Sequence, residues 1–171
     1  MLLNCHTYYS FCYGTLSVKK LLAEVYNKGY RSFALTDINN TSAVLDTLRL
    51  TEGKPLKPVI GIDFRNGVQQ QYVGLAENNE GYNELNVHLS KHLHSGEPFT
   101  PIAPDFSNAF IIYPFANYKG WPLKPHEFIG VSISDLRQLS LSPYQKQTHK
   151  LVALQQVSFG NAMQFHMHRL L

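Results

Sequence analysis

The sequence predicts an α/β fold, built as an irregular or incomplete (β/α) barrel around a mostly parallel sheet. Two observations predict it. Short apolar runs alternate with helix-like segments along the first 64 residues, and three of these runs end in polar side chains. Alternating strands and helices are typical of parallel sheets covered by helices. Parallel strands bring their carboxyl ends to one edge, so the polar residues there should lie together.

The expected elements follow from hydrophobic periodicity and from the turn residues between the apolar runs. We expect strands at residues 1–6, 32–36, 57–64, 70–75, 109–113, 127–132 and 150–155. We expect helices at residues 18–28, 41–52, 80–94, 134–139 and 161–171. The proline-rich stretch 95–108 should form the longest loop.

Polar caps and glycines set the expected helix ends. Ser17 can accept a hydrogen bond from the first turn of the first helix, and Gly29 can end that helix. Asn78 precedes the third helix and suits the same capping role. The second helix should turn an apolar stripe to the core, formed by Val44, Leu45 and Leu48.

The composition is that of one globular domain. Its 171 residues fit the usual size of a single domain, and 44% of them are hydrophobic, which allows a substantial core. Two cysteines are too few for a disulfide framework. No apolar run approaches membrane-spanning length, and the N-terminus lacks the pattern of a signal peptide. We therefore expect a cytoplasmic protein with no membrane partner.

The net charge of +3 is modest and unevenly distributed. Residues 119–171 carry six lysines and arginines against two carboxylates, whereas the first 118 residues hold nine basic and ten acidic side chains. A mildly basic last third can face a phosphate backbone or an acidic partner. A solvated surface is the simpler interpretation of the same charges.

Polar side chains at the ends of the first three strands are the best candidates for chemistry. His6 ends the first strand, Asp37 follows the second, and Asp63 lies at the end of the third. Convergence at one sheet edge would combine imidazole and carboxylate ligands, which suit zinc, manganese or iron. In the alternative interpretation Asp37 caps a turn, His6 makes a local hydrogen bond, and Asp63 is a solvated strand end.

Other histidines and loop carboxylates offer weaker sites. His88 and His92 stand four residues apart on a predicted helix and can face one metal ion. No carboxylate or cysteine is grouped with them in the sequence, so a solvent-facing pair is the simpler interpretation. Asp105 and His126 lie in predicted loops and are the candidates for replacement ligands if a metal site is to be completed.

Several segments resemble, in chain order, the motifs of PHP (polymerase and histidinol phosphatase) domains. His6-Thr7 followed by Tyr9-Ser10 resembles the first motif, Ala34–Asp37 the second, and Pro58–Phe64 the third. Leu75–Leu85 resembles the segment that follows the third strand in the alpha subunits of bacterial DNA polymerase III. The resemblance runs along the whole chain and is specific to that polymerase branch.

The resemblance implies a fold and a place in a longer protein. Residues 1–171 would form a single PHP-like domain, an irregular or incomplete (β/α) barrel of the PHP type. The domain would be an N-terminal fragment of a polymerase chain. The apolar character of the last helix, which continues to Leu171, favours a continuation of the chain in the same way.

The resemblance also implies that most metal ligands of the family are lost. His6 and Asp37 keep the family residue, and Asp63 stands where a glutamate is usual. The corresponding positions without the family's ligand are Asn4, Ile38, Tyr113, Gln156 and Ser158. Isoleucine cannot ligate, and amides and hydroxyls bind transition metals weakly. We therefore expect no catalytic residue in this chain, and either no cofactor or one weakly bound Zn²⁺, Mn²⁺ or Mg²⁺ ion.

Three functions are considered as hypotheses. Active PHP members are thought to hold up to three metal ions and to hydrolyse phosphoester bonds. The leading hypothesis is a non-catalytic structural and docking domain of a DNA-directed DNA polymerase in chromosomal replication. Its expected partners are the remainder of the alpha subunit, the separate proofreading exonuclease subunit, and DNA through the full-length polymerase. The alternative is a metal-dependent phosphoesterase with an atypical site. The third is a binding module that uses the barrel rim without a metal.

Overall fold

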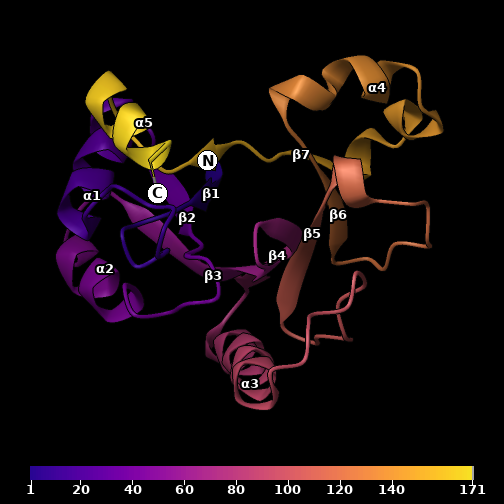
Figure 1. Cartoon of the computed structure of the whole chain (residues 1–171), viewed down its shortest axis with the longest axis horizontal. Coiled ribbons are helices and arrows are strands. Elements are labelled where there is room, and N and C mark those ends of the chain that lie inside the picture. The colour runs from indigo at the N-terminus through magenta and orange to yellow at the C-terminus, as the bar shows by residue number, and fades with distance from the viewer. Residues whose placement is uncertain (171) are drawn as a thin grey trace.

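The computed structural model describes residues 1–170, whose strands join into one eight-stranded sheet with the order β7-β6-β5-β4-β3-β2-β1-β8. Figure 1 shows the arrangement. The strands are β1 (Leu2–Cys5), β2 (Ser32–Leu35), β3 (Lys57–Asn66), β4 (Gln69–Ala76), β5 (Ala109–Pro114), β6 (Glu127–Val131), β7 (Leu151–Ala153) and β8 (Gln156–Val157). The α-helices are α1 (Val18–Asn27), α2 (Val44–Thr51), α3 (Asn79–Ser95), α4 (Leu136–Ser140) and α5 (Ala162–His168). Short 3₁₀ turns occupy Phe115–Asn117, Ile133–Asp135, Pro143–Lys146 and Thr148–Lys150.

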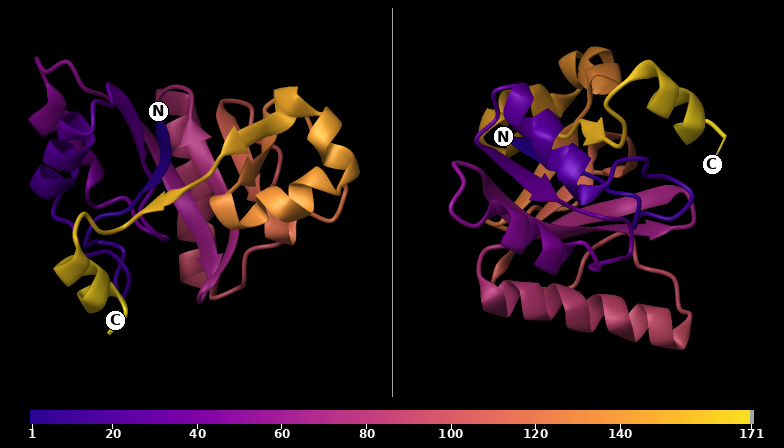
Figure 2. Two further views of the ribbon diagram at one scale, coloured as in Figure 1. Left: turned by 90° about the horizontal axis from the view of Figure 1, so that it is seen from above. Right: turned by 90° about the vertical axis from the view of Figure 1, so that its left-hand side faces the viewer.

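The sheet is curled so that its two edge strands come close together. β7 and β8 form opposite edges of the sheet, yet only residues 154 and 155 separate them along the chain. An extended chain of this length spans about 10 Å. The connecting segment crosses the molecule between the two ends of the sheet (Figure 2). The predicted α/β fold with an incomplete barrel is therefore confirmed.

Three apolar clusters fill the space around and inside this curled sheet. One, around Phe33, lies where β1 and β2 meet α1 and α2. A second, around Phe64, packs β3, β4 and β5 against α3. The third joins Ala34, Ile112 and Leu154, although their segments are far apart in the strand order. That third cluster is the interior of the barrel.

The predicted helix ends agree with the structure. The Ser17 side chain accepts a hydrogen bond from the backbone N–H of Lys20 at 3.3 Å, and Gly29 ends the turn with a φ of +80°. Asn78 caps α3 by accepting from the N–H of Gly81 at 3.0 Å. Positive φ favours glycine because it has no Cβ. None of the helices described within residues 1–170 is long and apolar enough to cross a membrane.

The apolar stripe predicted for the second helix is partly wrong. Val44 is buried, but Leu45 is 75% exposed and Leu48 is 45% exposed. The buried stripe of α2 is completed instead by Thr47 and Thr51. These positions follow Val44 at helical spacing, whereas the two leucines fall on the neighbouring face. The helix starts at Val44 rather than at residue 41, so it offers only two turns to bury.

The C-terminal third also differs in detail from the prediction. The strand expected over 150–155 ends at Ala153, because Leu154 enters the barrel interior and the chain then crosses to pair with β1 as β8. The helix expected over 134–139 begins as a 3₁₀ turn and continues as α4. The last helix is observed over Ala162–His168, and Leu171 lies outside the described residues.

Candidate functional site

Strand direction places the predicted site residues at one edge of the sheet. β1, β2 and β3 are mutually parallel, while β4 is antiparallel to both β3 and β5. β5, β6, β7 and β8 therefore run in the same direction as the first three strands. His6 follows β1 directly, and Asp37 lies just after β2. Asp63 joins them through a parallel bridge with Ile38, although it is not a strand end, because β3 continues to Asn66.

His6, Asp63 and Arg65 form a buried group that we call the ion-pair cluster. His6 Nε2 lies 3.1 Å from Asp63 Oδ2, and neither side chain is exposed. Arg65 Nη2 and Nε donate to the same oxygen at 2.7 and 3.1 Å. The guanidinium also packs over the ring of Tyr13 at 4.6 Å. The alternative interpretation expected a local hydrogen bond for His6 and a solvated Asp63. It is wrong for both residues, because His6 contacts a residue 57 positions away and Asp63 is buried.

The ion-pair cluster keeps the Asp63 carboxylate ionised in the interior. Burial by itself raises the pKa of a carboxyl group, since it removes water from the charged form. The hydrogen bonds and positive charges of His6 and Arg65 outweigh that effect and hold the pKa of Asp63 below its usual value. Sequence reasoning missed Arg65. Its signal was its spacing, because residues two apart on a strand lie on the same face.

Asp37 organises the loop after β1 with its carboxylate oxygens. Oδ1 accepts from the Thr7 backbone N–H at 2.6 Å and from Ser10 Oγ at 2.7 Å, and Oδ2 accepts from Thr7 Oγ1 at 2.7 Å. Ser10 Oγ in turn accepts from the N–H of Ile38 at 2.9 Å. The carboxylate thus holds two neighbouring loops together, as a capping residue does.

Some buried polar atoms of this edge have no partner within the described residues. They are Nδ1 of His6, Oδ1 of Asp63 and Nδ2 of Asn4. The Asn4 carbonyl, in contrast, accepts from Thr36 Oγ1 at 2.8 Å. Unpartnered buried polar atoms are rare in folded proteins, so an ordered water or ion is the usual explanation.

Three of the five positions at which the resemblance implies a lost ligand, Asn4, Ile38 and Gln156, lie near this edge. Ile38 is half-buried beside Asp63, and Gln156 sits opposite Asn4 in the β1–β8 pair, where it accepts from the hydroxyl of Tyr13. Tyr13 also packs on His168 of α5, with ring centroids 4.7 Å apart. These contacts connect the loop after β1 to β8 and to the last helix.

The other two positions are Ser158, which follows β8, and Tyr113, which lies on the other face of the sheet. Ser158 is buried, and its backbone carbonyl accepts from Thr15 Oγ1 at 2.9 Å. Tyr113 points to the α3 face of the sheet, opposite to Asp63, because its neighbour Ile112 is the residue that lines the barrel interior. The Tyr113 hydroxyl accepts from the N–H of Ala103 at 3.1 Å and donates to Glu127 at 3.3 Å.

A cavity of about 580 Å³ opens at the carboxyl edge of β5, β6 and β7. Its polar lining consists of amides and hydroxyls, with Asp135 as the single carboxylate. Oδ2 of Asp135 caps its own helix by accepting from the N–H and Oγ of Ser132 at 2.8 and 2.6 Å. This mouth of the barrel therefore presents weak metal ligands.

The remaining ligand candidates lie apart from this edge. Asp105 and His126 precede β5 and β6, so they lie toward the amino ends of those strands. There Asp105 Oδ1 pairs with Lys124 Nζ at 2.9 Å and lies 4.0 Å from His126 Nε2. Among residues 1–170 no group of three or more histidine, cysteine, aspartate or glutamate side chains is arranged to hold a metal ion.

The paired histidines of α3 are half-buried and pack against an aromatic core. The rings of His88 and His92 are 4.6 Å apart, and Nε2 of His88 lies 2.7 Å from the Tyr72 hydroxyl. Burial, with the nearby positive charges of His92 and Lys91, lowers the pKa of His88 to about 4. We call Tyr72, His88 and Tyr113 the aromatic cluster; its tyrosine rings are 6.1 Å apart.

Comparisons with known proteins agree with this architecture. A family model described as the PHP domain matches residues 3–118. The DNA polymerase III subunit alpha of Ureaplasma parvum is 28% identical over 110 residues, which cover 64% of this chain and 11% of that protein. The DNA polymerase III subunit alpha of Chlamydia muridarum is 27% identical over 97 residues, which cover 48% of this chain and 8% of that protein. The chain thus spans about a tenth of the length of these curated relatives.

A solved structure shares the fold over nearly the whole chain. An amidohydrolase from Chromobacterium violaceum superposes with a TM-score of 0.55 and 9% sequence identity. The superposition covers 94% of this chain and 89% of that structure. At such low identity the likeness concerns the fold alone.

Proposed function

The chain belongs to the PHP domain family, and on that premise we propose that it supports a replicative DNA polymerase III alpha subunit without hydrolysing phosphoesters itself. The two polymerase relatives support this assignment. In the whole subunit the proposed activity is DNA-directed nucleotidyl transfer during DNA replication. The proposed partners of this domain are the polymerase body and the proofreading exonuclease subunit, with DNA bound by the full-length polymerase.

The contact between Arg65 and Asp63 carries the proposal. Metal-assisted hydrolysis needs ions fixed by anionic and imidazole ligands, which lower the pKa of a bound water. Here the retained carboxylate of Asp63 already holds a guanidinium at 2.7 Å, and a cation at that oxygen would have to displace it. The oxygens of Asp37 are occupied by loop hydroxyls and a backbone N–H. Arg65 therefore supplies the positive charge that a metal ion would supply.

One observation favours the alternative function, a metal-dependent phosphoesterase with an atypical site. Nδ1 of His6 and Oδ1 of Asp63 are buried without partners among the described residues, so two ligand atoms remain free for an ion. The replacement ligands that this function requires are not nearby, because Asp105 and His126 pair near the opposite strand ends. The two functions differ in whether the protein hydrolyses phosphoesters.

The test is a hydrolysis assay on chelator-treated protein with Mn²⁺ or Zn²⁺ added back. Suitable substrates are p-nitrophenyl phosphate and bis(p-nitrophenyl) phosphate. We expect the wild-type rate to equal that of the His6→Ala variant and of a protein-free blank. His94→Ala is the matched control, because this histidine is exposed on α3. Metal-dependent turnover that survives His94→Ala and is lost on His6→Ala would establish the phosphoesterase.

A further inference from the structure

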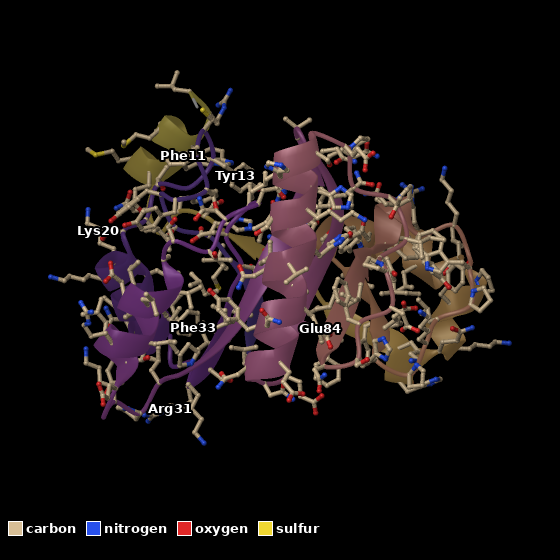
Figure 3. All side chains as sticks on the ribbon, turned by 90° about the horizontal axis from the view of Figure 1, so that it is seen from below. Phe11, Tyr13, Lys20, Arg31, Phe33 and Glu84 are labelled. Atoms are coloured by element: carbon tan, nitrogen blue, oxygen red, sulfur yellow. The ribbon has the colours of Figure 1, made fainter. Side chains whose placement is uncertain are left out.

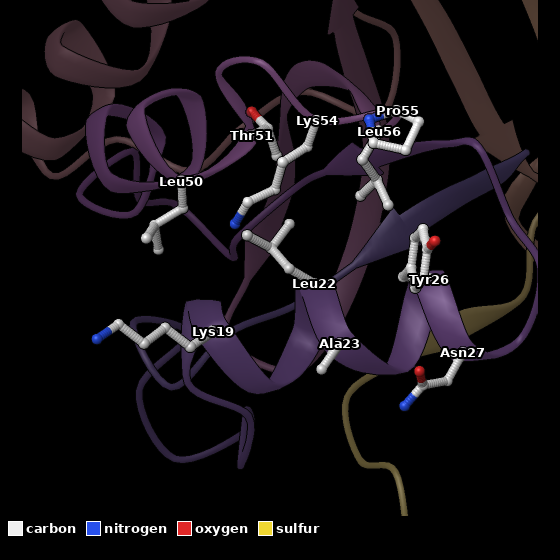
Figure 4. A pocket seen from close by; sticks show the side chains of 10 residues that line it. All are labelled: Lys19, Leu22, Ala23, Tyr26, Asn27, Leu50, Thr51, Lys54, Pro55 and Leu56. Atoms are coloured by element: carbon white, nitrogen blue, oxygen red, sulfur yellow. The ribbon is translucent and has the colours of Figure 1, made fainter.

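We infer that the groove between α1 and the end of α2 is a docking site for an acidic peptide segment of a partner protein, held by an apolar or aromatic anchor side chain. The inference rests on the docking role proposed above and adds its place and the chemistry of its partner. The groove has a volume of about 620 Å³ and is shown in Figure 4. Binding pockets usually measure about 300–1,000 Å³.

The floor of the groove is apolar. Leu22 and Leu56 form its nearly buried base, and half-buried Leu50 extends it. At one end stand Pro55 and the ring of Tyr26, which is 53% exposed (Figure 4). Exposed apolar groups that line a concave surface mark a site of association. An aliphatic or aromatic side chain would fit against Tyr26 and bury this floor.

The rim of the groove is positively charged. Lys19 and Lys54 are the charged side chains that line it, and both extend toward the end opposite Tyr26 (Figure 4). An adjoining depression shares Thr51 and Leu56 with the groove. Its charged residues are Arg49 and Lys57 against Glu52. Four cations against one anion favour an acidic occupant.

A peptide fits these features better than a nucleic acid strand does. A single-stranded nucleic acid would supply the negative charge, but a protein that binds it needs several aromatic side chains on which successive bases can stack. The groove offers a single tyrosine and a floor of leucines. A peptide with acidic side chains beside an apolar or aromatic side chain matches both the lysines toward one end and the apolar floor near Tyr26.

The groove is independent of the ion-pair cluster. None of the residues that line it belongs to that cluster or to the cavity at the barrel mouth. Hydrolysis and peptide binding can therefore be measured separately. A hydrolytic protein that binds peptides here would overturn the proposed function alone, and an inactive protein without peptide binding would overturn this inference alone.

The experiment selects peptides from a random 12-residue display library on the immobilised protein. Enriched sequences are synthesised with a fluorescein label, and their affinity is measured by fluorescence anisotropy at two salt concentrations. We expect acidic residues beside a Leu, Phe, Tyr or Trp, and an affinity that falls as salt rises, because surface charges are screened.

Three variants locate the binding. Lys19→Glu combined with Lys54→Glu should weaken binding at least tenfold, and so should Ala23→Glu, which places a negative side chain in the groove from an exposed helix position. Lys20→Glu is the matched control and should change the affinity less than twofold. It is a neighbouring lysine in the same helical turn, lies at the outer surface (Figure 3) and does not line the groove. Thermal unfolding confirms that each variant is folded.

Several outcomes would overturn the inference. Selected peptides without acidic residues, an absence of enrichment, or equal binding by the Ala23→Glu variant would each contradict it. So would a single-stranded oligonucleotide that displaces the peptides and binds more tightly than they do. A concentration-dependent dimer in sedimentation that Ala23→Glu abolishes would identify a second copy of this chain as the occupant instead.

Discussion

The ion-pair cluster and the aromatic cluster bury titratable groups on opposite faces of the same sheet, and they do so by opposite means. Inside the barrel, Asp63 stays ionised because Arg65 and His6 compensate its charge. Under α3, burial raises the pKa of Tyr72 and lowers that of His88, so both remain neutral near pH 7. A charge is retained in this interior only with a charged partner, and elsewhere the groups are kept neutral.

The comparison bears on two of the positions at which the resemblance implies a changed ligand. Asp63, on the inner face, keeps its charge and takes a guanidinium as counterion. Tyr113, on the outer face, has joined the aromatic core and forms hydrogen bonds with Ala103 and Glu127. In the first case an opposite charge compensates the buried group, and in the second the buried groups are neutral and hydrogen-bonded. If this is correct, the two clusters should respond differently to mutation and to acid.

The largest effect is expected from Arg65→Ala. Removing one partner of a buried ion pair leaves an uncompensated charge and costs about 3–5 kcal/mol of unfolding free energy. Arg65 and Asp63 are both almost completely buried, so the full effect applies. Urea unfolding measures it. Arg31→Ala, at an exposed arginine, is the control and should cost far less. A loss below about 1 kcal/mol on Arg65→Ala would contradict the ion-pair account, since that is the range of exposed pairs.

Tyr113→Phe should have a smaller effect in the aromatic cluster. The change keeps the ring but removes the hydroxyl that accepts from Ala103 and donates to Glu127. Buried groups left without a hydrogen-bond partner cost about 1–3 kcal/mol. The same urea unfolding experiment measures the loss, with Tyr8→Phe at an exposed tyrosine as the control. An unchanged or increased free energy of unfolding in Tyr113→Phe would show that these hydrogen bonds do not stabilise the fold.

The smallest effect is expected in the pH dependence of stability, because the two clusters should lose stability in different ranges of acid pH. The unfolded chain protonates His88 near pH 6.5, but the folded protein does so only near pH 4, so unfolding takes up a proton between these values. The free energy of unfolding should therefore decrease as the pH is lowered from 6.5 to 4. The His88→Gln variant should show a flatter dependence of stability on pH in this range. Thermal unfolding at a series of pH values measures it, with exposed His94→Gln as the control.

Asp63 should act in a separate and lower window. Its folded pKa lies below the unfolded value of about 3.9, so its contribution is present above that pH and is lost as pH falls further. His88→Gln should leave this lower transition in place. An unchanged profile between pH 6.5 and 4 in His88→Gln would contradict the assignment of that window to the aromatic cluster.

Much of the fold was predictable because local signals agree with it. The capping residues Ser17 and Asn78 and the Asn66-Gly67 turn define element ends from a few neighbouring residues. β8 was not predictable, because two residues carry no periodicity and pair with β1 only after the chain has crossed from β7 to the other edge of the sheet. The inward face of α2 was misassigned for a related reason: in a helix of two turns, several apolar stripes fit the sequence equally well.

The sequence predicted the location of the candidate site but not the part that Arg65 plays in it. Parallel strands brought His6, Asp37 and Asp63 to one edge as expected. The role of Arg65 depends on β3 continuing beyond Asp63 into a hairpin with β4, with an irregularity in register near Phe64. The side-chain face of Tyr113 depends on the same long-range pairing. Strand ends can be read locally, whereas the spacing of Asp63 and Arg65 becomes informative only once β3 is known to continue past Asp63.

The most direct test of the central claim is a calorimetric titration of Zn²⁺ and Mn²⁺ into chelator-treated protein, alongside His6→Ala. With Arg65 acting as the counterion of Asp63, we predict no stoichiometric uptake of either metal and no difference between wild type and variant. Tight binding of one ion per chain by the wild type, lost in His6→Ala, would contradict the account and make this edge of the barrel a working metal site.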